Sequence, residues 1–171
     1  MKIRTDYVTN SSSSSFILAF ETEDDFHRFE DECDWSDYDK LKRLVQYVFQ
    51  NKEQKEHREA SLELLRRYIE IEKYKDKVLE ELYPREEHIH EENYYSKRFD
   101  IMYSDEYKNR VNELIETDEE YNRKKKLIEN SEIVIETTIF DGDGGLLEWA
   151  IRNGFLESVF WKYCPLVWNI G

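Results

Sequence analysis

The chain has 171 residues, of which 39% are hydrophobic and 37% charged, and its formal net charge is −14. This length suits one domain, or one domain with a large insertion, and the hydrophobic content supports a core, which excludes a disordered tail. The negative charge argues against nonspecific binding to nucleic acid or to an anionic membrane, and it leaves open a basic protein partner, a metal ion or mimicry of a polyanion.

The cysteines and the hydropathy pattern indicate where the protein resides. Cys33 and Cys164 lie far apart and form no metal-binding or redox motif. We therefore expect buried thiols in a reducing compartment. No apolar stretch suggests a secretory signal or a membrane span of about 18 residues. The sequence predicts a cytoplasmic protein that does not contact a membrane.

A serine run followed by an apolar block dominates the N-terminal region. Ser11 to Ser15 lead directly into Phe16–Phe20. A short apolar block of this kind is typical of a strand that is buried on both faces at the centre of a sheet, with the serines as its polar lead-in. Thr22 and Asp25 then resemble a capping box. This box predicts a helix whose inner face carries Phe26, Phe29 and Cys33.

The middle of the chain has helical periodicity. The clearest stripe runs from Leu41 to Phe49. The polar segment Asn51 to Arg58 reads as a loop or a solvated helical turn. A long helix is expected from Glu59 to Leu82, and Pro84 ends it because proline cannot continue a helix.

Further helices are predicted before the chain returns to strand. Residues 85–93 read as a charged connector, and residues 94–103 as an aromatic segment whose structure the pattern does not define. Ser104 can cap a helix that extends through Ile115. Thr117 and Glu120 form another S/T-x-x-E box, which predicts a last helix ending near Asn130.

The C-terminal region is rich in strand formers. Ile133–Phe140 is mostly β-branched and predicts a second strand. A glycine-rich turn over 141–145 and a short helix over 146–152 follow. One more strand is expected between Phe155 and Ile170, with Pro165 at its start or in an edge position.

These elements predict an α+β fold with a small sheet built from N- and C-terminal strands and a large helical insertion between them. We expect a single domain over 1–171, with the sheet core in 1–34 and 131–171 and the helical insertion in 35–130.

The first residues resemble the opening of many uncharacterised microbial and phage proteins. The chain reads K-I-R-T-D-Y-V-T-N before the serines and F-I after them. Those proteins commonly begin K-I-R-x-D-F-V-T-N-S-S-S-S-S-F-I, so Tyr7 in place of Phe is the departure. No known activity accompanies this opening. The resemblance implies only that the segment has a role of its own, as a recognition or modification signal.

The serine run has three readings, which stay open. Its hydroxyl and N–H groups could cradle an anion with the help of Lys2 and Arg4, although the glycines and lysine of a P-loop are missing. It could be an exposed site of covalent modification. It could also stiffen the chain before the strand through local side-chain to backbone bonds. The candidate ligand residues are Ser11, Ser12, Ser13, Ser14 and Ser15.

Asp141 and Asp143 are the acidic candidates of the same pocket. The segment is similar to the first motif of haloacid-dehalogenase-type phosphatases, D-x-D-G-T-L. That resemblance implies a nucleophile at Asp141, a general acid/base at Asp143 and a bound Mg²⁺. Gly145 replaces the threonine, and no later acidic pair for the metal follows. A calcium loop would need a glutamate where Arg152 stands. We therefore favour a turn whose aspartates cap the following helix.

His88 and His90 are the candidate metal ligands. In an extended segment the two imidazoles would share a face and could chelate a divalent metal. In a helix, Glu87 and His90 would have the E-x-x-H spacing of di-iron bundles, but a matching second motif is missing. The favoured interpretation is a solvated, charged connector.

No residue set indicates a reaction, and no nucleophilic triad can be assembled, although an enzyme is not excluded. The sequence therefore predicts an acidic binding or regulatory module that needs no cofactor. It would engage a protein partner through the acidic helical part and the aromatic C-terminal segment, and would not bind nucleic acid directly. The first alternative is an anion or nucleotide pocket built from the serine run and the turn over 141–145. This pocket could carry out metal-dependent phosphate chemistry. The second is a modification or recognition tag. The oligomeric state stays open.

Overall fold

The computed structural model describes residues 13–32, 43, 46–47, 49–140 and 166–170. The chain divides into two compact units. The first, here called the sheet unit, comprises Met1–Leu62 and Lys126–Gly171, and the second, the helical unit, comprises Glu63–Lys125. The fold is α+β, with a small sheet formed by strands from both ends of the sequence and helices between them, as predicted.

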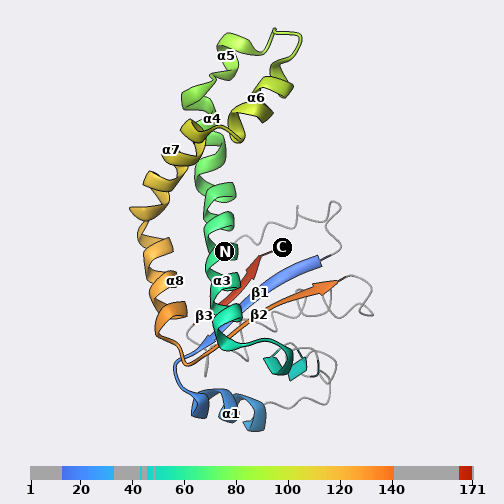
Figure 1. Cartoon of the computed structure of the whole chain (residues 1–171), viewed down its shortest axis with the longest axis vertical. Helices are drawn as coiled ribbons and strands as arrows, with labels where there is room; N and C mark the ends of the chain where they lie inside the picture. Colours follow the sequence, from blue (N-terminus) through green and yellow to red (C-terminus); the bar gives the residue numbers. More distant parts are fainter. Residues whose placement is uncertain (1–12, 33–42, 44–45, 48, 141–165, 171) are drawn as a thin grey trace. The chain divides into compact units, whose positions relative to one another are not determined.

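The sheet has three antiparallel strands in the order β2-β1-β3 (Figure 1). They are β1 (Ser13–Phe20), β2 (Ile133–Phe140) and β3 (Leu166–Ile170). The central position of β1 confirms the prediction made from its apolar block. β3 is an edge strand that begins directly after Pro165, which is also as predicted.

The start of β1 differs from the prediction. The strand begins at Ser13 rather than Phe16, and Ser13 pairs with Phe140 across the ladder. The Oγ atom of Ser15 lies 3.0 Å from Oγ1 of Thr138, its register partner. Cross-strand hydroxyl pairs of this kind stabilise antiparallel ladders. The last three serines are therefore strand residues and not a lead-in to the strand.

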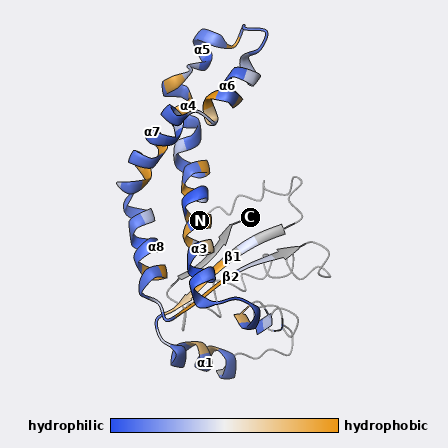
Figure 2. Cartoon of the chain, viewed as in Figure 1, coloured by the Kyte–Doolittle hydropathy of each residue, from blue (hydrophilic) through white to orange (hydrophobic). Residues whose placement is uncertain are grey.

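The core of the sheet unit lies on both faces of β1. Ile17, Leu18, Ala19 and Phe20 are all buried, although successive side chains point to opposite faces. In Figure 2 the hydrophobic colours concentrate on β1 and β2, whereas the helices are mainly hydrophilic. The expectation of a strand covered on both faces is confirmed.

Helix α1 (Glu23–Glu32) follows β1 and closes one part of this core. Thr22 Oγ1 accepts a hydrogen bond from the Asp25 N–H at 3.1 Å and donates to the Asp25 carboxylate at 2.7 Å. This is the predicted capping box. Phe26 and Phe29 are buried, each with its ring centroid 5.3 Å from that of Phe20. Cys33 lies outside the described residues.

Helix α3 (Gln54–Ile69) begins beside the edge of β2 that faces away from β1. Gln54 Oε1 accepts from the Val134 N–H at 2.8 Å, and His57 Nδ1 accepts from the Glu136 N–H at 3.1 Å. The helical alternative for Asn51 to Arg58 is thus confirmed from Gln54 onward, but the turn is the start of α3, and His57 is buried and not solvated. Gln54 and His57 are polar because they satisfy backbone donors of the sheet edge, whereas Lys55 and Glu56 between them are exposed.

The long central helix is confirmed up to its predicted end. α3 passes without interruption into one π-helical segment, η1 (Glu70–Tyr74), and then into α4 (Lys75–Leu82), which ends before Pro84. Its buried residues include Leu65, Ile69 and Val78. The π-helical segment has no counterpart in the prediction.

Four further helices follow: α5 (Arg85–His88), α6 (Tyr94–Met102), α7 (Asp105–Glu116) and α8 (Glu119–Asn130). Ser104 caps α7 as predicted, with its Oγ accepting from the Tyr107 N–H. The cap of α8 is Asp118 and not Thr117, because the Asp118 carboxylate accepts from the Tyr121 N–H at 2.7 Å. The Thr117 hydroxyl instead donates to carbonyls of α7.

Some predictions fall on residues that the structure does not describe. Of the stripe from Leu41 to Phe49, residues 43, 46–47 and 49 are described and are helical. The turn over 141–145, the helix over 146–152 and most of the aromatic C-terminal segment lie outside the described residues.

Candidate functional site

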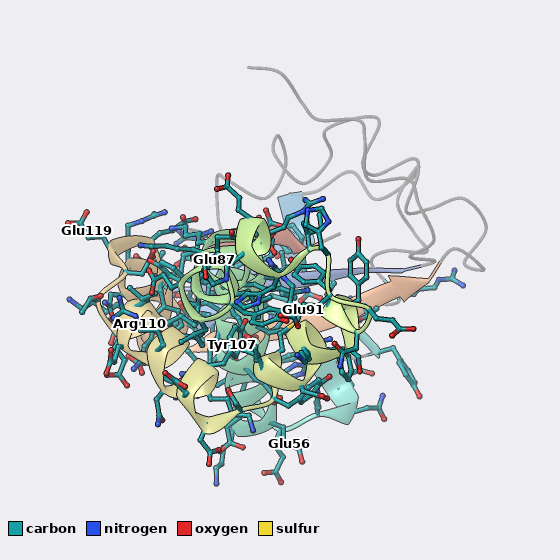
Figure 3. All side chains as sticks on the ribbon, turned by 90° about the horizontal axis from the view of Figure 1, so that it is seen from above. Glu56, Glu87, Glu91, Tyr107, Arg110 and Glu119 are labelled. Atoms are coloured by element: carbon teal, nitrogen blue, oxygen red, sulfur yellow. The ribbon has the colours of Figure 1, made fainter. Side chains whose placement is uncertain are left out.

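The candidate site lies in the helical unit, where α5 and α6 form the end furthest from the points at which the chain enters and leaves that unit (Figure 1). The chain reverses here after Pro84, and α6 packs against α4 and α7. Figure 3 looks onto this end, with Glu87 and Glu91 labelled. Charged side chains project from the helices around it.

The carboxylate of Glu91 connects the residues on both sides of this chain reversal. Glu91 accepts hydrogen bonds from the Tyr83 hydroxyl and from Lys97 Nζ, both at 2.7 Å, and lies 2.7 Å from His88 Nδ1. The bonds from Lys97, Tyr83 and His88 lower the pKa of Glu91 to about 2. Burial and the Glu91 carboxylate raise the pKa of Tyr83 to about 12. Glu91 is therefore an ionised anchor at neutral pH.

Stacked rings fix the inner face of α6. The Tyr83 ring stacks on the His88 ring at 4.0 Å and on the Tyr94 ring at 5.7 Å. Tyr94 is buried, and its hydroxyl accepts from Arg98 at 2.7 Å. Arg98 also reaches the Glu80 carboxylate at 3.4 Å. These contacts hold the orientation of α6 about its own axis.

The outer face of α6, together with its C-cap residue Tyr103, carries three exposed aromatic rings, which we call the aromatic stripe. Tyr95, Phe99 and Tyr103 follow one another at intervals of four residues, and their exposed fractions are 77%, 57% and 60%. This spacing places them on one face of a helix. The ring centroids of Phe99 and Tyr103 are 4.8 Å apart. α6 thus buries one aromatic residue, Tyr94, and exposes two, and its C-cap residue Tyr103 exposes a third, the reverse of an ordinary amphipathic helix.

The predicted metal ligands His88 and His90 do not lie in an extended segment. α5 is helical through His88, and the exposed His90 follows in a turn, so the extended segment required by the shared-face geometry is not present. The His88 imidazole is engaged with Tyr83 and Glu91. Among the described residues, no group of three or more histidine, cysteine, aspartate or glutamate residues could hold a metal ion.

The residues of the predicted anion pocket are described only in part. Ser11, Ser12, Asp141 and Asp143 lie outside the described residues, as does the turn over 141–145. The ladder pairs Ser13 with Phe140, the residue before Asp141. Ser14 lies next in β1, and the Ser15 hydroxyl is engaged with Thr138.

A second polar cluster surrounds Asp118 and was not predicted. The Tyr74 hydroxyl and Lys73 Nζ donate to the Asp118 carboxylate at 2.7 and 3.0 Å, and Lys73 also pairs with Glu120 at 2.8 Å. Lys73 and Tyr74, which both reach this carboxylate, are the last two residues of the π-helical segment η1. The cluster joins helices within the helical unit, and its groups are engaged with one another.

Replacing Glu91 by alanine should lower the pKa of the Tyr83 phenol from about 12 while leaving it above its ordinary value. The carboxylate that disfavours the phenolate is removed, whereas burial remains. The shift is measurable by ¹³C NMR titration with labelled tyrosine. Glu87→Ala, which removes a neighbouring carboxylate that makes no bond to Tyr83, is the control; an unchanged Tyr83 pKa in Glu91→Ala would contradict the assignment.

The sequence contained one signal for this site, the four-residue spacing of Tyr95, Phe99 and Tyr103, but not the direction in which the rings point. In the described part of the chain, no helix is sufficiently long and apolar to cross a membrane. No known protein family, curated protein or solved structure matches this chain.

Proposed function

We propose that the chain is an acidic binding or regulatory module that engages a protein partner, and that the aromatic stripe is its principal contact. The observation that carries this proposal is the outward placement of Tyr95, Phe99 and Tyr103 on a helix whose opposite face is fixed. Aromatic residues are enriched in the cores of protein interfaces, where they supply most of the binding energy. A site held rigid before binding loses less conformational entropy on association.

The magnitude of the contact is sufficient for a specific interaction. Burial of one large apolar side chain contributes roughly 1.5–3 kcal/mol. Loss of two of the three rings should therefore weaken binding by more than about tenfold, which corresponds to 1.4 kcal/mol. The predicted second contact, the aromatic segment from Phe155 to Ile170, belongs to the proposal as well. The proposal also includes a cytoplasmic location, which the two separated cysteines support. It includes the absence of direct nucleic-acid binding, which the net charge of −14 supports.

Site-specific photo-crosslinking in the native host tests the proposal. The photoreactive residue p-benzoylphenylalanine is introduced at Phe99 and, as a control, at Ile71, which is also exposed and lies in η1. We expect one crosslinked protein species from position 99 and none from position 71. The additional changes Tyr95→Ser and Tyr103→Ser should abolish that species. Equal crosslinking at the two positions, or none at position 99, would contradict the proposal.

A second candidate function is the anion or nucleotide pocket. The observation that favours it is the pairing of Ser13 with Phe140, which brings the last three serines of the run and the segment before Asp141 onto neighbouring strands. A thermal-shift screen with inorganic phosphate, nucleotides and Mg²⁺ tests it, with Asp141→Asn and Asp143→Asn as variants. If the serine run is instead a modification tag, the intact mass of the protein from its native host would exceed the sequence mass.

A further inference from the structure

The cations of α6 are already engaged by its own unit. Lys97 Nζ bonds to Glu91 at 2.7 Å. Arg98 pairs with Glu80 at 3.4 Å and approaches Asp76 at 3.7 Å. Neither cation is available to offset the negative charge of the outer surface.

Unlike these cations, several carboxylates near the aromatic stripe are not engaged in ion pairs. Residues 85–106 contain seven acidic and three basic residues. Within the described ranges, four exposed carboxylates that adjoin the stripe in sequence make no ion pair or hydrogen bond through their oxygens: Glu92, Asp100, Asp105 and Glu106. The stripe therefore combines exposed rings with neighbouring carboxylates that make no ion pair within the helical unit.

On the inner face of α6, an arginine contacts both an aromatic ring and a carboxylate. The guanidinium of Arg98 lies 5.9 Å from the centroid of the Tyr94 ring, while its nitrogens reach the Tyr94 hydroxyl and the Glu80 carboxylate. One arginine thus interacts with an aromatic residue and a carboxylate at the same time. The aromatic stripe and the carboxylates that adjoin it in sequence offer rings and carboxylates again, but residues 92–106 contain no second arginine.

We infer that the partner segment recognised by the aromatic stripe is basic and rich in arginine. This inference rests on the proposed function and names the chemistry of the partner. A planar guanidinium can stack on the faces of Tyr95, Phe99 and Tyr103 and donate paired hydrogen bonds to a carboxylate. The lysine ammonium is a compact, strongly hydrated charge that does neither as well. The site should therefore prefer arginine to lysine at equal charge.

Fluorescence anisotropy of the full chain with two labelled probe peptides tests this preference. One probe alternates arginine with glycine, and the other has lysine at every arginine position. At about 0.1 M salt, where charges are screened beyond about 10 Å, the arginine probe should bind about tenfold more tightly. Two variants should each weaken its binding by at least about fivefold: Tyr95→Ser with Phe99→Ser and Tyr103→Ser, and Glu92→Gln with Asp100→Asn and Glu106→Gln.

A matched control separates recognition from general attraction. Glu63→Gln with Glu72→Gln and Glu119→Gln removes the same charge from exposed positions of the helical unit away from α6. It should change the affinity less than about twofold, and circular dichroism should confirm that every variant folds. Equal binding of the two probes, or equal weakening by the control, would overturn the inference. If the arginine probe fails to bind while crosslinking at position 99 persists, this inference falls and the proposed function stands; if both fail, both are wrong.

Discussion

Replacing Phe20 by alanine should lower the free energy of unfolding of the sheet unit by about 3–5 kcal/mol, the usual cost of truncating a buried aromatic residue. Phe20 is fully buried at the end of β1. Its ring contacts those of Phe26 and Phe29, so the truncation leaves a cavity that both the strand and α1 would have to fill. We expect the largest loss of stability among single changes in the sheet unit.

Denaturant-dependent hydrogen exchange of the β1 and β2 amides measures this loss for the sheet unit alone. Phe99→Ala is the matched control, because it makes the same chemical change at a ring that is 57% exposed. The control should leave the protection of β1 within about 0.5 kcal/mol of the original value. Similar losses from the two changes would show that Phe20 is not a core residue.

Replacing Asp118 by asparagine should destabilise the helical unit by about 2 kcal/mol at neutral pH. Burial raises the pKa of Asp118, but hydrogen bonds from Tyr74, the Tyr121 N–H and Lys73 outweigh burial and hold the pKa at about 2, against 3.8 for an ordinary aspartate. A difference of this size corresponds to about 2 kcal/mol of linked stability. Asparagine keeps an oxygen for the cap but loses the charge that Lys73 faces.

The same pair of pKa values defines a pH window. Because the native carboxylate has the lower pKa, the unfolded chain binds more protons between the two values, so this stability is complete above about pH 4 and is lost as the pH falls toward about 2. Urea titrations of the original chain and of Asp118→Asn should differ above the window and converge within it. Glu91 and Glu120 also titrate at low pH, so the difference between the two proteins is the relevant quantity. Glu119→Gln, which changes an exposed neighbour, should show no such convergence.

Short-range signals allowed much of the fold to be predicted. Ile133–Phe140 has the predicted bounds because β-branched residues specify a strand locally. Thr22 and Ser104 were predicted as caps because a cap bonds to residues within one helical turn. Thr117 failed because aspartate at the next position offers a stronger, charged acceptor to the same turn.

Long-range contacts explain what the sequence could not show. The polarity of Gln54 and His57 serves strand residues about 80 positions away, so a local pattern misreads them as solvated. The outward direction of the aromatic stripe could not be predicted either, because amphipathic patterning assumes that rings face a core, whereas α6 and its C-cap residue turn three of them outward. The pairing of His88 with His90 required an extended backbone, whereas Glu91 and Tyr83 stabilise a helical turn there.

The register of β1 has a consequence for the order of folding. Its nearest partner in sequence, Ile133, is translated more than 100 residues after Phe20, or on the order of ten seconds later at typical rates. During that interval the apolar block Phe16–Phe20 leaves the ribosome without a strand to pair with. The intervening helices depend on local contacts and can form first, in microseconds to milliseconds. The nascent chain thus acquires its helical unit before its sheet, and the Phe16–Phe20 block is the segment that a ribosome-associated chaperone would have to shield.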